Sequence, residues 1–207
     1  MKQGPRQDAV KALAVLFMRE PVAGRAKTRM AGFLGADRAV AWYRDQLVSL
    51  SLGLQHADGI ELVASITPES SVIRMSRLLK GMRFWVQKGK DLGERIREAL
   101  SRGLASGYEK VMVVATDVPD LSPQDLEAAS SALDRSPVVL GPCPDGGYYL
   151  IGIRSEVPDL WSGVRWSTDT VLDTTLSLAD ALGIAPILLR SLRDIDSAKD
   201  WLEFYSC

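Results

Sequence analysis

The chain has 207 residues, enough for one α/β domain that buries roughly 70 % of the surface of its unfolded chain. Apolar residues make up 46 % and charged residues 25 % of the sequence, which are values of ordinary globular proteins and exclude a disordered or fibrous chain. The net charge of −1 and the lack of a local basic patch argue against a nucleic-acid partner, and we expect one domain over residues 1–207.

The apolar run 12–18 is the first predicted element. It is far shorter than the ~20 residues of a membrane-spanning helix, and no small-residue cleavage pattern follows it. We therefore expect a buried strand, no membrane span and a cytoplasmic protein.

Helix-like and strand-like segments alternate along the rest of the chain. Helices are predicted at 36–55, 70–80, 93–105, 123–133, 168–182 and from 197 onward. Strands are predicted at 60–66, 83–87, 111–115, 137–141, 148–153 and 186–190. This alternation is typical of a largely parallel sheet covered by helices on both faces.

The loop after the first strand, residues 21–29, contains a glycine and three cations: Gly24, Arg25, Lys27 and Arg29. A glycine lets the backbone approach a ligand, and cations at alternate positions of one extended segment can converge on an oligophosphate. Ligands of open α/β sheets lie outside the carboxyl ends of the strands, where this loop falls. A solvated basic loop is the plainer alternative, and the spacing is not that of a Walker P-loop.

Carboxylates follow in two places. Asp117 lies at the carboxyl end of strand 111–115, and Asp194 and Asp196 form an Asp-x-Asp pair much later. Mg²⁺ takes oxygen ligands, usually one or two protein carboxylates together with nucleotide phosphates, so the three aspartates are candidate metal ligands. Helix capping is the alternative for Asp196, because Ser197 follows it.

The turn between strands 137–141 and 148–153 reads Asp145-Gly146-Gly147. It predicts a hairpin, but paired glycines also let a substrate approach the main chain, and Asp145 can accept a hydrogen bond from a sugar hydroxyl or an acceptor. Gly93 opens helix 93–105, where the N-terminal N–H groups favour an anion; a plain helix start is the alternative.

Cysteine and histidine contribute little to the predicted chemistry. Cys143 and Cys207 belong to no CxxC or Cys/His cluster, so neither a disulfide nor a structural zinc is expected. The single histidine, His56, follows an apolar helical pattern and is interpreted as structural. Catalysis must then come from carboxylates, Lys or Arg and a bound metal.

Six motifs in order carry a family resemblance: P-V-A-G-R-A-K-T-R, D-L-G-E-R, T-D-V-P-D-L, G-P-C-P-D-G-G-Y-Y-L-I-G, W-S-T-D-T-V-L and D-I-D-S-A-K-D. Over residues 12–202 the chain resembles a bacterial family of glycosyltransferase-like proteins described as nucleotide-diphospho-sugar transferases. It is similar more distantly to the phospholactate and molybdenum-cofactor nucleotidyltransferases. The resemblance implies a GT-A-like, Rossmann-like α/β sandwich with a mostly parallel sheet.

The resemblance also implies site residues. The nucleotide phosphates would lie against Gly24, Arg25, Lys27 and Arg29. Mg²⁺ or Mn²⁺ would be held by Asp117, with Asp194 and Asp196 nearby. The chain departs from the family at Ala115, where glycine is commoner, and at the charged stretch 18–20.

Two transferase reactions and one non-catalytic role fit this sequence. In nucleotidyl transfer to a phosphorylated small acceptor, Arg25 and Lys27 neutralise developing charge while Asp117 holds the metal. The alternatives are glycosyl transfer from a nucleotide-sugar and a non-catalytic nucleotide-binding module. The basic loop favours the first, and the sequence does not identify the nucleotide, the acceptor, the general base or the oligomeric state.

Overall fold

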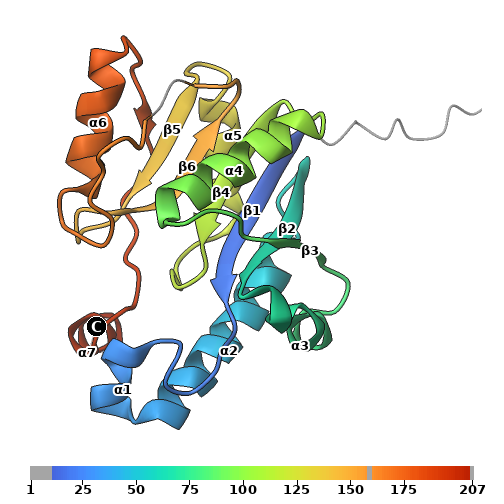
Figure 1. The fold of residues 1–207 in the computed structure, drawn as a ribbon, viewed down its shortest axis with the longest axis vertical. Coiled ribbons are helices and arrows are strands. Elements are labelled where there is room, and N and C mark those ends of the chain that lie inside the picture. Colours follow the sequence, from blue (N-terminus) through green and yellow to red (C-terminus); the bar gives the residue numbers. More distant parts are fainter. Residues whose placement is uncertain (1–10, 158–159, 206–207) are drawn as a thin grey trace, which may run out of the picture.

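A seven-stranded sheet forms the centre of the molecule, with the strand order β3-β2-β1-β4-β6-β5-β7 (Figure 1). The computed structural model describes residues 11–157 and 160–205. The strands are β1 (Ala12–Arg19), β2 (Ile60–Thr67), β3 (Arg83–Val86), β4 (Lys110–Ala115), β5 (Val138–Pro142), β6 (Tyr148–Ile153) and β7 (Ile187–Leu188). They match the predicted strands closely, except that the last one is only two residues long.

Most neighbouring strands run parallel. β1 pairs in parallel with β2 and β4, β2 with β3, and β5 with β7. β6 runs antiparallel to both β4 and β5, so β5 and β6 form the predicted hairpin around Gly146 and Gly147. The predicted fold class, a single α/β domain with a mostly parallel sheet, is confirmed.

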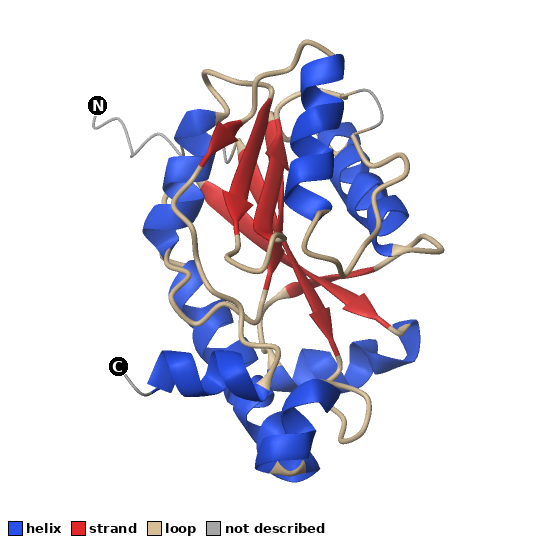
Figure 2. Ribbon diagram, turned by 90° about the vertical axis from the view of Figure 1, so that its left-hand side faces the viewer, coloured by secondary structure: helices blue, strands red, loops and turns tan. Residues whose placement is uncertain are grey.

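Helices cover both faces of the sheet (Figure 2). They are α1 (Thr28–Leu34), α2 (Ala36–Leu54), α3 (Val72–Leu78), α4 (Leu92–Ala105), α5 (Pro123–Ala132), α6 (Val171–Ala181) and α7 (Ala198–Tyr205), with a 3₁₀ turn at Glu69–Ser71. Successive residues of β1 point to opposite faces, so Leu16 packs with α2, α3 and α5, whereas Val15 packs with α4 and α6. In the described part of the chain, no helix is long and apolar enough to cross a bilayer.

A small third layer lies below the carboxyl end of β1, where α1, α2 and α7 meet (Figure 1). Its buried residues are Met30, Ala39 and Ile195, packed against Trp42, Trp201 and Phe204. This layer places α1 and the residues before α7 beside the ends of β1 and β4.

Helix α1 was not predicted. The segment Thr28–Leu34 is only seven residues long and contains Gly32, so its intrinsic helix propensity is low. Met30, its one buried residue, packs into the third layer. Tertiary packing therefore decides this helix, and the expectation of one extended basic segment over residues 21–29 is wrong.

Candidate functional site

A first cavity lies at the carboxyl ends of β1 and β4, and we call it the loop cavity. It has a volume of about 360 Å³. It is lined by Arg19, Arg25, Ala26, Lys27, Thr28, Arg29, Tyr43, Asp117, Ser167 and Asp196. Four cations and two carboxylates are among these residues, so the cavity is basic overall.

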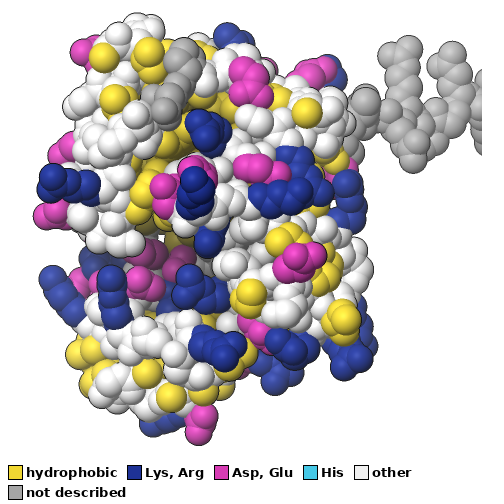
Figure 3. Space-filling view, in the orientation of Figure 1, with side chains coloured by type: hydrophobic (Ala, Val, Ile, Leu, Met, Phe, Trp, Pro, Cys, Tyr) yellow, Lys and Arg dark blue, Asp and Glu magenta, His cyan; other side chains and the backbone are white. Residues whose placement is uncertain are grey.

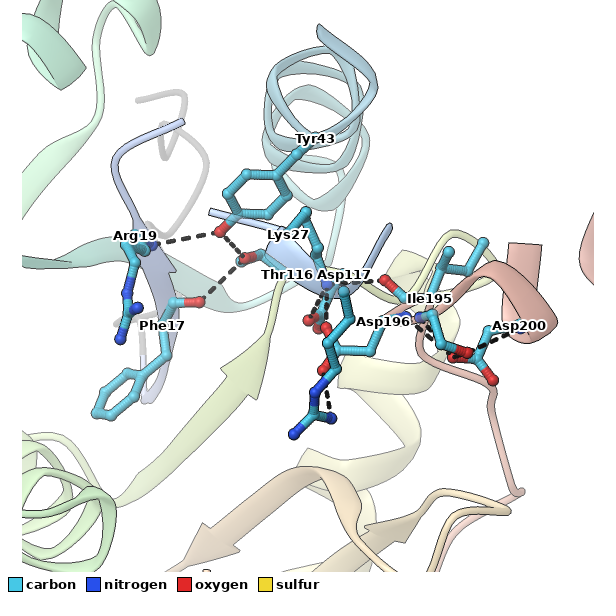
Figure 4. A network of polar contacts seen from close by, with 11 residues as sticks. Phe17, Arg19, Lys27, Tyr43, Thr116, Asp117, Ile195, Asp196 and Asp200 are labelled. Atoms are coloured by element: carbon cyan, nitrogen blue, oxygen red, sulfur yellow. Dashed lines mark hydrogen bonds and ion pairs between the residues drawn. The ribbon is translucent and has the colours of Figure 1, made fainter. Parts of the chain in front are cut away.

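Lys27 is the centre of the loop cavity (Figure 4). Its Nζ donates to Asp117 Oδ2 at 2.7 Å and to Asp196 Oδ1 at 2.6 Å, and a third bond reaches the carbonyl oxygen of Ile195 at 2.8 Å. The Lys27 side chain is only 5 % exposed. All three of its donors are therefore used by the protein itself.

The charge of Lys27 is fixed by its neighbours. Burial lowers the pKa of Lys27, but the charges of Asp117 and Asp196 outweigh burial and raise that pKa above its ordinary value. The ammonium also lies 5.6 Å from the centroid of the Tyr43 ring, within cation–π range. Lys27 is thus a permanent internal cation, whereas Arg19, Arg25 and Arg29 line the cavity at exposed positions.

Hydrogen bonds join the elements that carry this network. Ile195 N donates to Asp117 O at 2.9 Å, which brings the end of β4 beside the segment before α7. Thr116 Oγ1 donates to Phe17 O at 3.0 Å and so ties β4 to β1 (Figure 4). The carboxylates of Asp117 and Asp196 meet because of these bonds, although 78 residues separate them.

Backbone strain is concentrated here as well. Among the described residues, the only non-glycine residues with positive φ are Lys27, at 50°, and Ser167, at 63°. Both line the loop cavity. Such conformations cost about 1 to 3 kcal/mol each and persist where the surroundings fix them, typically at functional sites.

A second cavity adjoins the first, and we call it the hairpin cavity. It has a volume of about 370 Å³. Its floor is apolar and aromatic: Phe17, Leu92, Ile96, Val113, Ala115, Tyr148, Tyr149, Leu150, Ile151, Trp166 and Val171. Its polar lining is Arg29, Asp145, Gly147, Ser167, Thr168, Asp169, Asp194 and Asp196.

The β5–β6 hairpin and the segment 166–170 form two walls of the hairpin cavity and interlock. Gly146 has φ of 86°, and a Cβ atom there would lie 1.9 Å from Asp169 O, so only glycine fits. Leu172 N donates to Gly146 O at 2.8 Å, and Asp145 Oδ1 accepts from Gly147 N at 2.9 Å. The glycine pair thus has a structural role in fixing the cavity wall.

Trp166 is held against α4 and β6. Its ring packs against Gly93, where a Cβ atom would lie 2.8 Å from the ring, and it meets Tyr148 edge to face at a centroid distance of 6.3 Å. Gly93 is not among the described residues that line the loop cavity or the hairpin cavity. Its position supports close packing under Trp166, and its predicted role in nucleotide binding stays a prediction.

A group of possible metal ligands lies at the hairpin cavity. Asp145, Asp194 and Cys143 can each place a ligand atom within 4.8 Å of the others. Burial raises the pKa of Asp194 to about 7, and the charges of Asp117, Asp145 and Asp196 act in the same direction. Burial likewise raises the pKa of the Cys143 thiol, which stays protonated and is a poor ligand for a hard cation.

This charge distribution fits a divalent cation. Lys27 and Arg29 pair with Asp117 and Asp196, whereas Asp194 forms no ion pair with any residue that the structure describes. Carboxylate oxygens are the ligands that Mg²⁺ and Mn²⁺ take, and a cation beside Asp194 would offset both the burial and the neighbouring carboxylate charges that raise its pKa.

A third cavity opens on the other side of the loop cavity, with a volume of about 460 Å³. It is lined by Arg19, Glu20, Val22, Gly24, Arg25, Thr67, Pro68 and Arg95, and we call it the Arg95 cavity. It shares Arg19 and Arg25 with the loop cavity. Glu20 is bound by Arg74 and Ser71, so its charge is already compensated.

The structure brings most of the predicted site residues together. Arg25, Lys27, Arg29, Asp117 and Asp196 line the loop cavity, Asp145, Gly147 and Asp194 line the hairpin cavity, and Gly24 lines the Arg95 cavity.

The sequence-based site omitted several lining residues: Arg19, Tyr43, Trp166, Ser167 and Asp169. Trp166, Ser167 and Asp169 belong to the run W-S-T-D-T at residues 166–170. A helix was predicted from residue 168 onward, whereas α6 begins only at Val171.

Comparison with known proteins assigns this chain to a family. A family described as "Uncharacterized protein conserved in bacteria (DUF2064)" matches residues 51–168, more than half of the 207 residues. The chain belongs to this family. The match includes β2 through β6 and the segment up to Thr168, so it contains Asp117, Asp145 and Trp166.

Solved structures resemble this DUF2064 chain over almost its whole length. A protein from Desulfovibrio desulfuricans G20, provisionally described as a nucleotide-diphospho-sugar transferase, is 28 % identical with a TM-score of 0.89, over 94 % of this chain and 86 % of that one. The predicted resemblance to nucleotide-diphospho-sugar transferases is confirmed.

Two more distant structures share the fold. One is CMP:2-keto-3-deoxy-manno-octonic acid synthetase complexed with CTP, at 12 % identity and a TM-score of 0.58, covering 95 % of this chain and 97 % of that one. The other is Rv0371c from Mycobacterium tuberculosis H37Rv, complexed with manganese, at 15 % identity and a TM-score of 0.55, covering 95 % and 98 %.

Proposed function

We propose that this chain is a Mg²⁺- or Mn²⁺-dependent transferase that binds a nucleoside triphosphate and transfers its nucleotidyl group to a small acceptor. The observation that carries the proposal is the loop cavity. There the buried Lys27 donates hydrogen bonds to Asp117 and Asp196, and exposed arginines line the same cavity. The relatives named as nucleotide-diphospho-sugar transferase and CTP-binding synthetase support a nucleotide as the donor.

The arrangement of the three cavities suggests how the donor lies. The loop cavity takes the phosphates, because Arg19, Arg25 and Arg29 offer charge-assisted hydrogen bonds there. It shares arginines with the Arg95 cavity on one side, and Arg29, Ser167 and Asp196 with the hairpin cavity on the other. We place the nucleoside toward the Arg95 cavity and the second substrate in the hairpin cavity.

Residues Asp117 and Asp194 would hold the metal in this proposal, with Asp196 beside them and bound to Lys27. A bound divalent ion would neutralise negative charge on the phosphate oxygens at the reacting phosphorus. Arg25 and Arg29 would add to that neutralisation, and Lys27 keeps the Asp117 and Asp196 carboxylates in position. The Asp117→Asn variant should lose metal-dependent nucleotide binding and keep its fold, and unchanged Mn²⁺-nucleotide affinity in calorimetry would refute the metal assignment.

Glycosyl transfer from a nucleotide-sugar is the second candidate, favoured by the description of the D. desulfuricans relative. The two reactions differ in the charge of the donor. A triphosphate offers one more charged group to the arginines than a nucleotide-sugar does, and a charge-assisted contact is worth about 1.5 to 3 kcal/mol, or roughly tenfold to a hundredfold in affinity.

Competition titrations decide between the two candidates. GTP, CTP and UTP are compared with GDP-mannose, CDP-glycerol and UDP-glucose at fixed Mg²⁺. We expect one triphosphate to bind at least tenfold tighter than its conjugate. A conjugate that binds tighter than its parent triphosphate would establish glycosyl transfer as the better function.

A further inference from the structure

The hairpin cavity has an unusual charge for a site beside a phosphate-binding loop. Its charged lining consists of four carboxylates and one guanidinium: Asp145, Asp169, Asp194, Asp196 and Arg29. The Arg29 guanidinium, the one cation among the described lining residues, lies 3.6 Å from Asp196 Oδ2. In space-filling view, acidic side chains gather within the hollow above α1, and basic ones lie around it (Figure 3).

Asp169 lies outside the group of Cys143, Asp145 and Asp194 that can share a cation, so a cation bound to that group leaves the Asp169 carboxylate without a partner. Asp145 comes from the hairpin and Asp169 from the facing segment, and both are exposed. Neither forms an ion pair with a residue in the described ranges. An ionised carboxylate only accepts hydrogen bonds, so hydroxyl or ammonium donors satisfy it, whereas a second anion does not.

The rest of the lining favours a ring with an apolar face and hydroxyl groups. Trp166 and Tyr148 offer aromatic surface at the floor, and the Ser167 and Thr168 hydroxyls stand at the edge. Gly146 packs closely against the main chain of Asp169 and so fixes this edge to the hairpin, which means that the lining is formed before a ligand binds.

We propose that the hairpin cavity takes a hydroxyl-bearing compound that carries no negative charge, such as a neutral or amino sugar, and disfavours phosphorylated and carboxylated compounds. This inference rests on the proposed function, since it names the class of its second substrate. It differs from the phosphorylated acceptor that sequence reasoning predicts. The physical reason is that a phosphate would enter a cavity where carboxylates outnumber cations.

Nucleotide-sugars that differ only in the charge of the sugar test the proposal. Affinities of UDP-glucose, UDP-glucosamine and UDP-glucuronate are measured by calorimetry at fixed Mg²⁺, with UTP as the reference. We expect UDP-glucuronate to bind about fivefold to tenfold more weakly than UDP-glucose, and UDP-glucosamine to bind at least as tightly. The Asp169→Asn variant should bring the glucose-to-glucuronate ratio toward one, and Asp169→Lys should invert it.

Asp180→Asn is the matched control, because Asp180 is exposed on the nearby helix α6 and is not part of the cavity lining. It should leave the ratio unchanged. A wild-type ratio of one, tighter binding of UDP-glucuronate, or no binding of any nucleotide-sugar while UTP binds would overturn the proposal. If none of UTP, CTP and GTP binds, the proposed function fails, and the charge of the cavity is then measured without nucleotide.

The charge of the cavity is measured without nucleotide by collisional quenching of Trp166 fluorescence. The Trp166 signal is the difference between wild type and Trp166→Phe. Each quenching constant is divided by that of free N-acetyltryptophanamide, because the two ions quench free indole with different efficiency. On this relative scale caesium should quench Trp166 more strongly than iodide, because the surrounding carboxylates attract the cation, and Asp169→Asn should reduce this asymmetry. Equal relative quenching by the two ions, or stronger relative quenching by iodide, would overturn the proposal whatever nucleotide the protein binds.

Discussion

The loop cavity and the hairpin cavity adjoin each other and share Arg29, Ser167 and Asp196, yet they carry opposite charge. In the loop cavity, Lys27 and Arg29 pair with two carboxylates, and Arg19 and Arg25 add two further exposed cations. In the hairpin cavity, carboxylates exceed cations and an aromatic floor replaces the salt bridges. In the two proposals, one end of the sheet would hold a polyphosphate in the loop cavity next to an uncharged group in the hairpin cavity.

The two cavities are also built differently. Charge pairs hold the loop cavity together, since Lys27 bonds to both sides of it. Close backbone packing holds the hairpin cavity together, at Gly146 against Asp169 and at Gly93 against Trp166. Substitutions should therefore damage the two through different mechanisms.

The Lys27→Met variant should have the largest effect, because it removes the cation between two carboxylates while keeping the side-chain volume. We expect the free energy of unfolding to fall by about 3 to 4 kcal/mol, and triphosphate binding to weaken more than nucleoside binding. Urea denaturation and calorimetry measure the two effects.

Lys110→Met is its control. Lys110 Nζ lies 2.7 Å from Asp134 Oδ1, but that carboxylate is mostly exposed, so the loss should be no more than about 1 kcal/mol. Equal losses in the two variants would contradict a special role for Lys27.

The Gly146→Ala variant should disrupt the hairpin cavity alone. Its methyl group would collide with the Asp169 carbonyl, and φ at this position is positive, so we expect a loss of about 2 to 3 kcal/mol. Gly163→Ala has a similar φ of 73° with open space around it and should cost about 1 kcal/mol. Triphosphate affinity should stay near wild type in both variants, and a large loss in Gly146→Ala would show that the two cavities do not act separately.

The Arg29→Ala variant tests the residue that the two cavities share. Its guanidinium is mostly exposed, so stability should hardly change, while triphosphate affinity should fall about tenfold. Arg38→Ala, at an exposed position on α2, serves as the control and should bind normally. Unchanged triphosphate affinity in Arg29→Ala would remove this arginine from the phosphate site.

The smallest expected effect comes from the pKa of Asp194. Below its folded-state pKa of about 7 the Asp194 carboxyl is protonated, whereas in the unfolded chain it stays ionised down to a pKa near 3.8. The folded state therefore binds more protons in this window, and stability falls as pH rises through it. Between pH 6 and pH 8 the loss should be about 1 kcal/mol, or about 2 to 4 °C in Tm.

Thermal unfolding in EDTA at both pH values measures this effect as the difference between wild type and Asp194→Asn. The variant should lack this part of the pH dependence. Parallel curves for the two proteins would show that Asp194 is not held in an acidic, buried setting.

Local sequence patterns predicted much of the fold. Apolar runs such as 111–115 identified buried strands, the 3.6-residue apolar period identified α2, and Ser122 with Pro123 marked the start of α5, where the structure has a capping box. These signals are local, because the periodicity of a strand or helix depends on near neighbours. The end of the apolar run likewise predicted Asp117 just beyond the carboxyl end of β4.

Only the tertiary structure decided what these residues do for one another. The sequence contained Lys27, Asp117 and Asp196 as separate candidates for phosphate and metal binding. Their mutual contacts depend on the third layer and on the bond from Ile195 N to Asp117 O, which joins segments far apart in the chain. The acidic character of the hairpin cavity has the same origin, since Asp145, Asp169 and Asp194 come from three segments that meet only after the sheet has formed.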